Sequence, residues 1–280
     1  MKSILVPTDF SVFAQEALNY AVQLSKWNGA KITLVHVYDY LSYHLHDRLR
    51  TLISEHNEKT RNELSKRLQT VKDKVFVDDG ITIQTRLYNG SVISGIAEAA
   101  EETQADLIIM GTLGVSGLKE KLMGSKTLAL LRKSRLPVLV IPPGYQWQPP
   151  RLVSIAIKND VDVNLLDPAF EIADIFSARV NAVMFQPDEE DSFEVITETR
   201  TGQLLIEKMK KLYQRNMELV CLPSKNFIRN SSDYIRIEEV DLFVMIMRHD
   251  SWMNYFLGNS MTQKMAAHPI VPILAISAAE

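Results

Sequence analysis

The stretch DLIIMGTLGVSGLKEKLMGSKT (residues 106–127) joins an apolar segment, a glycine-bearing loop and the start of a helical pattern. The segment DLIIMG (106–111) is almost uninterruptedly apolar, which is typical of a strand that is covered on both faces of a sheet. A helix is expected over 125–134. Strand, loop and helix in this order form the repeating unit of a parallel α/β sheet, so this stretch predicts that fold class.

The same alternation extends through residues 1–143. Further strands are expected at 2–8, 31–38, 81–88 and 137–142. Helices are expected at 11–28, 45–74 (one long helix or two) and 91–104. Ser11 is a suitable cap for the first helix, and Gly29 is suited to end it. The order predicts a doubly wound, five-stranded parallel sheet of the Rossmann-like class, in which ligands bind at the carboxyl ends of the strands where strand order reverses.

The pattern restarts after GYQWQPPR (144–151), which we interpret as a linker with an exposed-type Trp147. Strands are expected at 152–157, 179–185, 217–223, 241–247 and 270–276, helices at 164–178 and 201–215, and an irregular polar segment at 227–239. The two halves also align by residue: ILVPTD (4–9) with IAIKND (155–160), DLIIMG with DLFVMIM (241–247), and LPVLVIP (136–142) with VPILAIS (271–277). We therefore predict two tandem domains, 1–143 and 152–280, related by a pseudo-twofold axis. Their last strands are the expected pairing edges, because an apolar edge strand needs a partner.

Composition narrows the class of protein. The 280 residues include 31 basic and 34 acidic side chains, which argues against non-specific binding of nucleic acid. No apolar run approaches the roughly 20 residues that span a bilayer, and the apolar run at the N-terminus is too short for a signal peptide, so we expect no membrane segment and a cytoplasmic protein. The single cysteine, Cys221, excludes an intrachain disulfide and is expected to be a buried structural thiol.

Gly111, Gly114 and Gly124 follow the spacing G-x2-G-x9-G, and Ser125 comes next. Backbone N–H groups approach a phosphate closely only where side chains are absent, and the positive end of the following helix favours an anion. The hydroxyls of Ser125 and Thr127 add donors. The fold alone is not expected to require all three glycines, so we interpret the segment as a triphosphate loop; simple turn and cap glycines are the alternative. It is neither a Walker A loop nor the dinucleotide pattern G-x-G-x-x-G.

These residues resemble the universal stress protein family. The resemblance rests on the glycine loop, the opening ILVPTDFS (4–11), the VHV of the second strand (35–37) and the closing LPVLVIP. It covers all of residues 1–143, and 152–280 resemble a degenerate second copy. The resemblance implies a five-stranded parallel α/β fold that binds ATP, with or without Mg²⁺. It also implies either a homodimer or an intrachain pseudo-dimer, since tandem members imitate the family dimer within one chain.

The resemblance also implies roles for particular residues. Asp9 would meet the adenosine, with Pro7 and Thr8 shaping that wall, although a helix-capping role for Asp9 is an open alternative. Val37 would offer backbone hydrogen bonds to adenine, and Met110 would lie beside the base or ribose. The phosphates would be held, largely through backbone, by Gly111, Gly114, Gly124, Ser125, Lys126 and Thr127.

The second half departs from this pattern. Its corresponding stretch, MRHDSWMNYFLGNS (247–260), has no glycine at either early position, and Arg248, His249 and Trp252 stand there instead. We predict that this half does not hold ATP in the family manner.

No other motif carries chemistry. His44, His46 and Asp47 fit a solvated helix start better than a metal site. No candidate base is placed to activate water. The sequence thus predicts a stress-response, ATP-binding regulatory or interaction module, with no catalytic residue, no metal, and no nucleic-acid or membrane partner. A slow ATP hydrolase and a nucleotide-free dimerisation scaffold are the alternatives.

Overall fold

The computed structural model describes residues 1–39, 50–112, 125–157, 161–186, 193–247 and 270–278. The strands of the first half are β1 (Ser3–Pro7), β2 (Lys31–Tyr38), β3 (Gln84–Asn89), β4 (Leu107–Gly111) and β5 (Val138–Ile141). Its helices are α1 (Val12–Asn28), α2 (Arg50–Asp79), α3 (Val92–Glu102) and α4 (Ser125–Lys133). Along the chain, each described helix therefore follows one strand and precedes the next, as the sequence predicted.

The second half repeats the succession. Its strands are β6 (Leu152–Ile157), β7 (Arg179–Gln186), β8 (Met217–Pro223), β9 (Leu242–Met247) and β10 (Ile273–Ser277). Its helices are the 3₁₀ turn η2 (Val163–Leu166), α5 (Asp167–Phe176), α6 (Phe193–Tyr213) and α7 (Phe227–Ile237).

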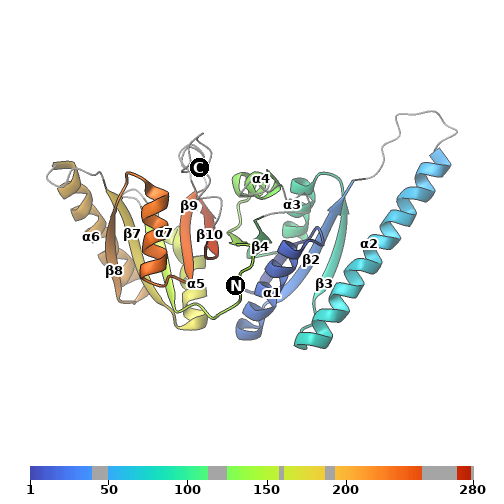
Figure 1. Cartoon of the computed structure of the whole chain (residues 1–280), viewed down its shortest axis with the longest axis horizontal. Coiled ribbons are helices and arrows are strands. Elements are labelled where there is room, and N and C mark those ends of the chain that lie inside the picture. The colour runs from blue at the N-terminus through green and yellow to red at the C-terminus, as the bar shows by residue number, and fades with distance from the viewer. Residues whose placement is uncertain (40–49, 113–124, 158–160, 187–192, 248–269, 279–280) are drawn as a thin grey trace.

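All ten strands form one sheet in the order β3-β2-β1-β4-β5-β10-β9-β6-β7-β8 (Figure 1). Every neighbouring pair is parallel except β5 and β10. In each half the chain winds outward in one direction and then in the other, so strand order reverses between β1 and β4 and again between β6 and β9. The predicted fold class, two tandem doubly wound five-stranded units, is confirmed.

The two halves meet at the antiparallel pair β5–β10. Val138, Leu139 and Val140 lie opposite Ala275, Leu274 and Ile273. Leu139 and Leu274 are both fully buried, at 0% exposure. The prediction that the last strands of the two halves pair is therefore confirmed, and the chain is an intrachain pseudo-dimer.

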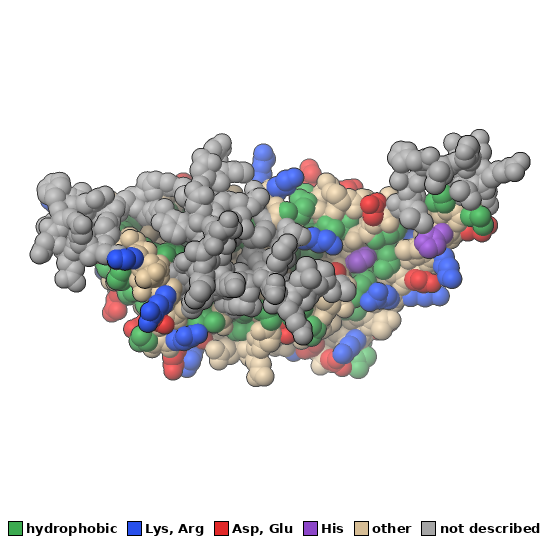
Figure 2. Space-filling model, turned by 45° about the horizontal axis from the view of Figure 1, so that its top comes forward, with side chains coloured by type: hydrophobic (Ala, Val, Ile, Leu, Met, Phe, Trp, Pro, Cys, Tyr) green, Lys and Arg blue, Asp and Glu red, His purple; other side chains and the backbone are tan. Residues whose placement is uncertain are grey.

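Helices cover the sheet on both faces. One apolar cluster gathers α1, α2, α5 and α6 on one face, and a second gathers α3, α4 and α7 on the other. Acidic and basic side chains are interspersed on the described surface that Figure 2 shows, in keeping with the nearly balanced charge. No helix in the described ranges is long and apolar enough to cross a membrane.

The termini of α1 follow the sequence prediction. The Ser11 hydroxyl accepts a hydrogen bond from the Ala14 backbone N–H at 3.2 Å and so caps the helix. Gly29 ends the helix in the left-handed conformation, with φ of 70°, and its N–H donates to the Ser25 carbonyl. The following helix, α2, is a single helix over its described length.

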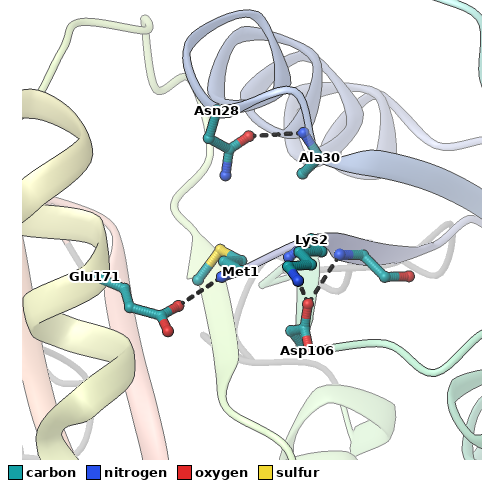
Figure 3. Close-up of polar contacts among 7 residues, drawn as sticks. Met1, Lys2, Asn28, Ala30, Asp106 and Glu171 are labelled. Atoms are coloured by element: carbon teal, nitrogen blue, oxygen red, sulfur yellow. Dashed lines mark hydrogen bonds and ion pairs between the residues drawn. The ribbon is translucent and has the colours of Figure 1, made fainter.

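A carboxylate ties the starts of adjacent strands together in each half. Asp106, just before β4, accepts hydrogen bonds from the backbone N–H groups of Lys2 and Ser3 at 2.5 and 2.9 Å (Figure 3). Asp241, just before β9, accepts from those of Arg151 and Leu152 at 2.7 and 3.0 Å. The same contact thus joins β1 to β4 and β6 to β9, and the tandem repeat extends to individual hydrogen bonds.

The second half contains one helix that the sequence analysis missed. Residues 227–239 were predicted to be irregular, but α7 occupies 227–237. Tyr234 and Ile235 of this helix are buried against the sheet, and Phe227 packs on Phe185 at 4.1 Å between ring centroids. Three apolar residues at helical spacing are enough to fix a helix whose other positions are polar.

The prediction of a buried thiol was also wrong. Cys221 is exposed, because β8 is an outer strand of the sheet. Partial burial nevertheless raises the pKa of its thiol, so the thiolate is disfavoured.

The linker packs against the first half rather than extending into solvent. Trp147, expected to be exposed, is half-buried, and its ring meets Tyr20 edge to face at 4.7 Å between centroids. It also contacts Phe176 of α5 at 5.7 Å. The ammonium of Met1 adds an ion pair to Glu171 of α5 at 2.8 Å (Figure 3). Aromatic and charged contacts therefore join the halves beside the β5–β10 pair.

The paired carboxylates give a test of the repeat. Asp241 is 2% exposed, so Asp241→Ala leaves buried N–H groups without an acceptor and should lower the free energy of unfolding by about 2–3 kcal/mol. Asp106 is exposed, so water replaces it, and Asp106→Ala should cost about 1 kcal/mol or less. Urea unfolding of both variants measures the difference; equal costs would contradict this account.

Candidate functional site

The point at which strand order reverses in the first half lies between β1 and β4. Ile4 and Leu5 pair with Leu107 and Ile108, so the two strands run side by side to their carboxyl ends. The connection after β1 leads to α1 and β2, whereas α4 leads to β5 on the other side. In such sheets the diverging connections leave a crevice at this edge, which is the usual ligand position.

The predicted site residues that are described converge on this edge. Pro7 ends β1, and Thr8 and Asp9 follow it; Val37 lies near the end of β2. Met110, which is buried, and Gly111 end β4. The helix α4 begins at Ser125, with Lys126 exposed and Thr127 buried. Gly114 and Gly124 lie outside the described residues, as do Arg248, His249 and Trp252 of the second half and the candidate metal residues His44, His46 and Asp47.

The start of α4 is fastened to the end of β4. The Thr127 hydroxyl lies 3.2 Å from the Gly111 carbonyl oxygen and 3.4 Å from that of Thr112, and it donates toward both. This contact holds the first turn of α4, whose N–H groups lack partners within the helix, against the end of β4. The hydroxyl itself therefore has a structural use besides the phosphate contact that the resemblance implied.

Gly111 is required by the fold. A Cβ on this residue would lie 2.7 Å from the carbonyl oxygen of Phe13 and 2.9 Å from its carbonyl carbon. The first turn of α1 crosses β4 at this close approach, which only glycine allows. Packing alone therefore accounts for Gly111, one of the three glycines on which the interpretation as a phosphate loop rested.

Asp9 closes the turn between β1 and α1. Its Oδ1 accepts a hydrogen bond from the Ser11 N–H at 3.0 Å, while the Thr8 hydroxyl accepts from the Phe10 N–H at 3.0 Å. Phe10 adopts a positive φ of 62°, which is unusual for a residue with a side chain. Asp9 therefore stabilises the turn before α1, whereas the cap of the helix itself is Ser11. The role of Asp9 toward adenosine stays a prediction.

Val37 presents backbone groups past the end of β1. The Val35 carbonyl accepts from the Thr8 N–H at 2.8 Å, so the polar groups of Val35 face β1. The N–H and C=O of Val37 point the same way, because residues two apart on a strand share an orientation. Since β1 ends at Pro7, opposite Val35, these groups lie at the open edge beyond it. This is a suitable position for hydrogen bonds to a planar base.

Thr112 was not predicted as a site residue. It is fully buried at the end of β4, and its hydroxyl has no hydrogen-bond partner among the described residues. A buried hydroxyl without a partner is costly, and it is satisfied when a ligand or water fills the adjoining space. Only its place directly after Gly111 could have suggested it from sequence.

A second missed cluster stands at the end of β2. The ring of His36 lies 4.7 Å from that of Phe10, and the Arg67 guanidinium lies over the Phe10 ring at 4.0 Å. The Nδ1 of His36 is 2.6 Å from the Thr8 carbonyl oxygen, which requires a proton on that nitrogen because a carbonyl only accepts. Burial lowers the pKa of His36, and the charges of Arg67 and Lys126 add to this, against opposing effects of the Thr8 carbonyl and Asp9. Basic groups from α2 and α4 therefore both reach this edge.

No group of three or more His, Cys, Asp or Glu side chains suited to a metal ion occurs in the part of the chain that the structure describes. The arrangement at this edge is instead one of backbone N–H groups, hydroxyls and cations, which bind anions.

Gly111→Ala should destabilise the fold by about 1–3 kcal/mol, because the new methyl group collides with backbone atoms of α1. Phe13→Ala should not rescue it, since the closest atoms belong to the backbone rather than to the Phe13 ring. Denaturant unfolding of the single and double variants measures both effects. Full stability of Gly111→Ala, or rescue by Phe13→Ala, would show that the close approach is not as described.

His36 should make stability fall on acidification. Its folded pKa is lowered, so below the unfolded value of 6.5 the unfolded chain binds a proton that folded His36 resists, and acid favours unfolding. The variant His36→Asn keeps an N–H donor but does not titrate. The free energy of unfolding of the wild type, minus that of this variant, should decrease as the pH falls from about 7.5 to about 5.5. The other histidines are present in both proteins, so their contributions cancel in this difference. A constant difference over this window would contradict the assigned direction.

Comparison with known proteins identifies the family. The model of the universal stress protein family matches residues 1–142. A universal stress protein of Staphylococcus saprophyticus is 36% identical over 145 residues, which is 50% of this chain and 83% of that protein. One of Methanocaldococcus jannaschii is 32% identical over 142 residues, 50% of this chain and 81% of that protein.

Solved structures extend the similarity of fold to the whole chain. A universal stress protein from Archaeoglobus fulgidus superposes with a TM-score of 0.68 at 17% identity, covering 99% of this chain and 98% of that one. A protein of the same description from Pseudomonas aeruginosa gives a TM-score of 0.62 at 14% identity, covering 99% and 93%. The family model covers half of the chain, and the chain covers more than four fifths of these relatives, so this chain belongs to the universal stress protein family.

Proposed function

We propose that the chain binds one ATP in its first half, at the carboxyl ends of β1, β2 and β4, and acts as a nucleotide-dependent regulatory or interaction module in stress response. The observation that carries the proposal is the convergence at one crevice of the Asp9 turn, the open backbone edge of Val37 and the start of α4 beside Gly111. These three features come from separate strands, and the reversal of strand order is what brings them together.

The base would lie against β2. The N–H and C=O of Val37 offer one donor and one acceptor at the open edge beyond β1. An adenine presents an acceptor next to an amino group, so it can pair with both. Asp9, on the turn after β1, stands where a ribose hydroxyl would follow. Its Oδ1 accepts from the Ser11 N–H, which fixes the carboxylate on this turn.

The phosphates would lie at the start of α4. The helix dipole and the N–H groups of its first turn favour an anion there. Lys126 is exposed at this turn and adds a positive charge beside the N–H groups. The buried hydroxyl of Thr112 can donate to the same ligand. The chemistry of this donor set fits a phosphate group.

The second half, residues 152–280, is proposed to be a degenerate copy that holds no ATP. It keeps the reversal of strand order, between β6 and β9, and the carboxylate contact at Asp241. Its sequence after β9 lacks the glycines at the early loop positions and carries Arg248, His249 and Trp252 there. Side chains at these positions would prevent the close backbone approach that a phosphate needs.

The test is a count of nucleotide per chain. Mass spectrometry of ligand released from purified protein, and calorimetric titration of emptied protein with Mg-ATP, should both give one ATP per chain. Gly114→Val should weaken binding by about 100-fold or more, because a branched side chain keeps the loop backbone from the phosphates. Gly111→Ala is unsuitable for this purpose, since it also disturbs packing.

Trp252→Ala is the matched control in the second half and should leave the affinity for ATP unchanged. Protein that carries no nucleotide and gives no heat with Mg-ATP would exclude the proposal. Two ATP molecules per chain, or a loss of ATP binding in Trp252→Ala, would exclude the proposal that only the first half binds ATP.

A further inference from the structure

A separate cavity of about 500 Å³ lies between α1, the C-terminal part of α2 and the linker. Residues 145–147 of the linker form one wall, so the site exists only because the linker folds back on the first half. It lies along the helices rather than at the strand ends, and the proposal for ATP does not bear on it. Its volume is within the range of small-molecule sites. Its lining includes Glu16 and Tyr20 of α1, Lys74, Asp78 and Asp79 of α2, and Tyr145 and Trp147 of the linker.

Three polar atoms of residues that line this cavity have no hydrogen-bond partner in the described part of the chain: the hydroxyls of Tyr20 and Tyr145 and Oε2 of Glu16. Tyr20 is only 1% exposed, and its hydroxyl has no partner among the described residues. The Oε1 of Glu16 accepts from the Gly144 N–H at 3.0 Å, whereas its buried Oε2 has no partner in the described part of the chain. Glu16 and Tyr20 are four residues apart on α1, so both project from one face of the helix. A ligand that satisfies both must donate to the carboxylate and either donate to or accept from the hydroxyl.

Aromatic rings form the second component of the wall. Tyr20 contacts both linker rings, with centroids 5.9 Å from Tyr145 and 4.7 Å from Trp147. Burial raises the pKa of Tyr20 well above its usual value and that of Tyr145 to about 12, with the charge of Asp241 adding to both. Both phenols are therefore neutral near pH 7. Such rings pack against an apolar ligand body and attract a cation to their faces.

The charge of the cavity is negative. Glu16, Asp78 and Asp79 line it with one cation, Lys74. The ammonium of Lys26, outside the cavity, pairs with Asp79 at 2.8 Å and neutralises it. The two remaining negative charges, on Glu16 and Asp78, exceed the one positive charge on Lys74. The cavity therefore disfavours an anionic ligand.

We propose that this cavity is a second ligand site, which takes a small primary amine with an aromatic or apolar body. The ammonium donates to Oε2 of Glu16, and the body lies against Tyr145 and Trp147, with the Tyr20 hydroxyl meeting a polar group of the ligand. Because the linker forms one wall, an occupied site holds the linker on α1 and α2.

Tyramine serves as the probe, and tyrosol, which replaces the amine with a hydroxyl, serves as its neutral counterpart. Calorimetric titration of the full chain should show one saturable tyramine site. The affinity for tyrosol should be lower than that for tyramine by about tenfold or more, because tyrosol lacks the charge-assisted hydrogen bond to Glu16. Fluorescence of Trp147, in a background carrying Trp27→Phe and Trp252→Phe, should change with the same midpoint.

Glu16→Gln should weaken tyramine binding by about tenfold or more, and Tyr20→Phe by about threefold. Glu98→Gln, an exposed glutamate on α3 across the sheet, is the matched control and should change nothing. Unchanged affinity for Mg-ATP in Glu16→Gln would show that the variant is folded and the two sites are separate. No saturable binding of tyramine, equal binding of tyrosol, or no effect of Glu16→Gln would overturn the proposal, since a cavity that holds only water gives these results.

Discussion

The antiparallel pairing of β5 with β10 is the constraint on which the rest of the architecture depends. Each half on its own would end in a short apolar edge strand, and an edge of this kind pairs with another chain unless it is covered. Here the second half supplies the partner, and Leu139 and Leu274 meet across the seam with no exposed surface. A partner on the same chain has a high effective concentration, so the seam forms without a second copy.

Other contacts between the halves follow from this seam. It brings α5 beside α1, where Phe176 meets Trp27 at 5.3 Å and Trp147 at 5.7 Å, and it places Glu171 at the Met1 ammonium. The linker must return along α1 to begin β6, which creates the cavity beside Glu16 and Tyr20. The crevice at β1 and β4 depends less on the seam, because a single doubly wound unit already contains its reversal of strand order.

Much of the fold was predictable because its signals are local. Apolar runs gave β4 and β5, Ser11 and Gly29 gave the ends of α1, and the repeat of sequence gave the seam. The errors arose where burial depends on distant residues. The helix α7 uses only a few apolar positions, Cys221 is exposed because β8 has no outer neighbour, and Trp147 is half-buried because Tyr20 lies under it. In the site, Gly111 shows the same effect: its close neighbour is Phe13, and no pattern in the loop itself indicates that packing requires a glycine.

The central claim is that the first half alone holds ATP. A crystal structure of the full chain grown with Mg-ATP tests it most directly. We expect density for one nucleotide at the carboxyl ends of β1 and β4, with adenine hydrogen-bonded to the backbone of Val37 and the triphosphate at the start of α4. An empty crevice at saturating nucleotide, or a nucleotide bound at β6 and β9 instead, would contradict it.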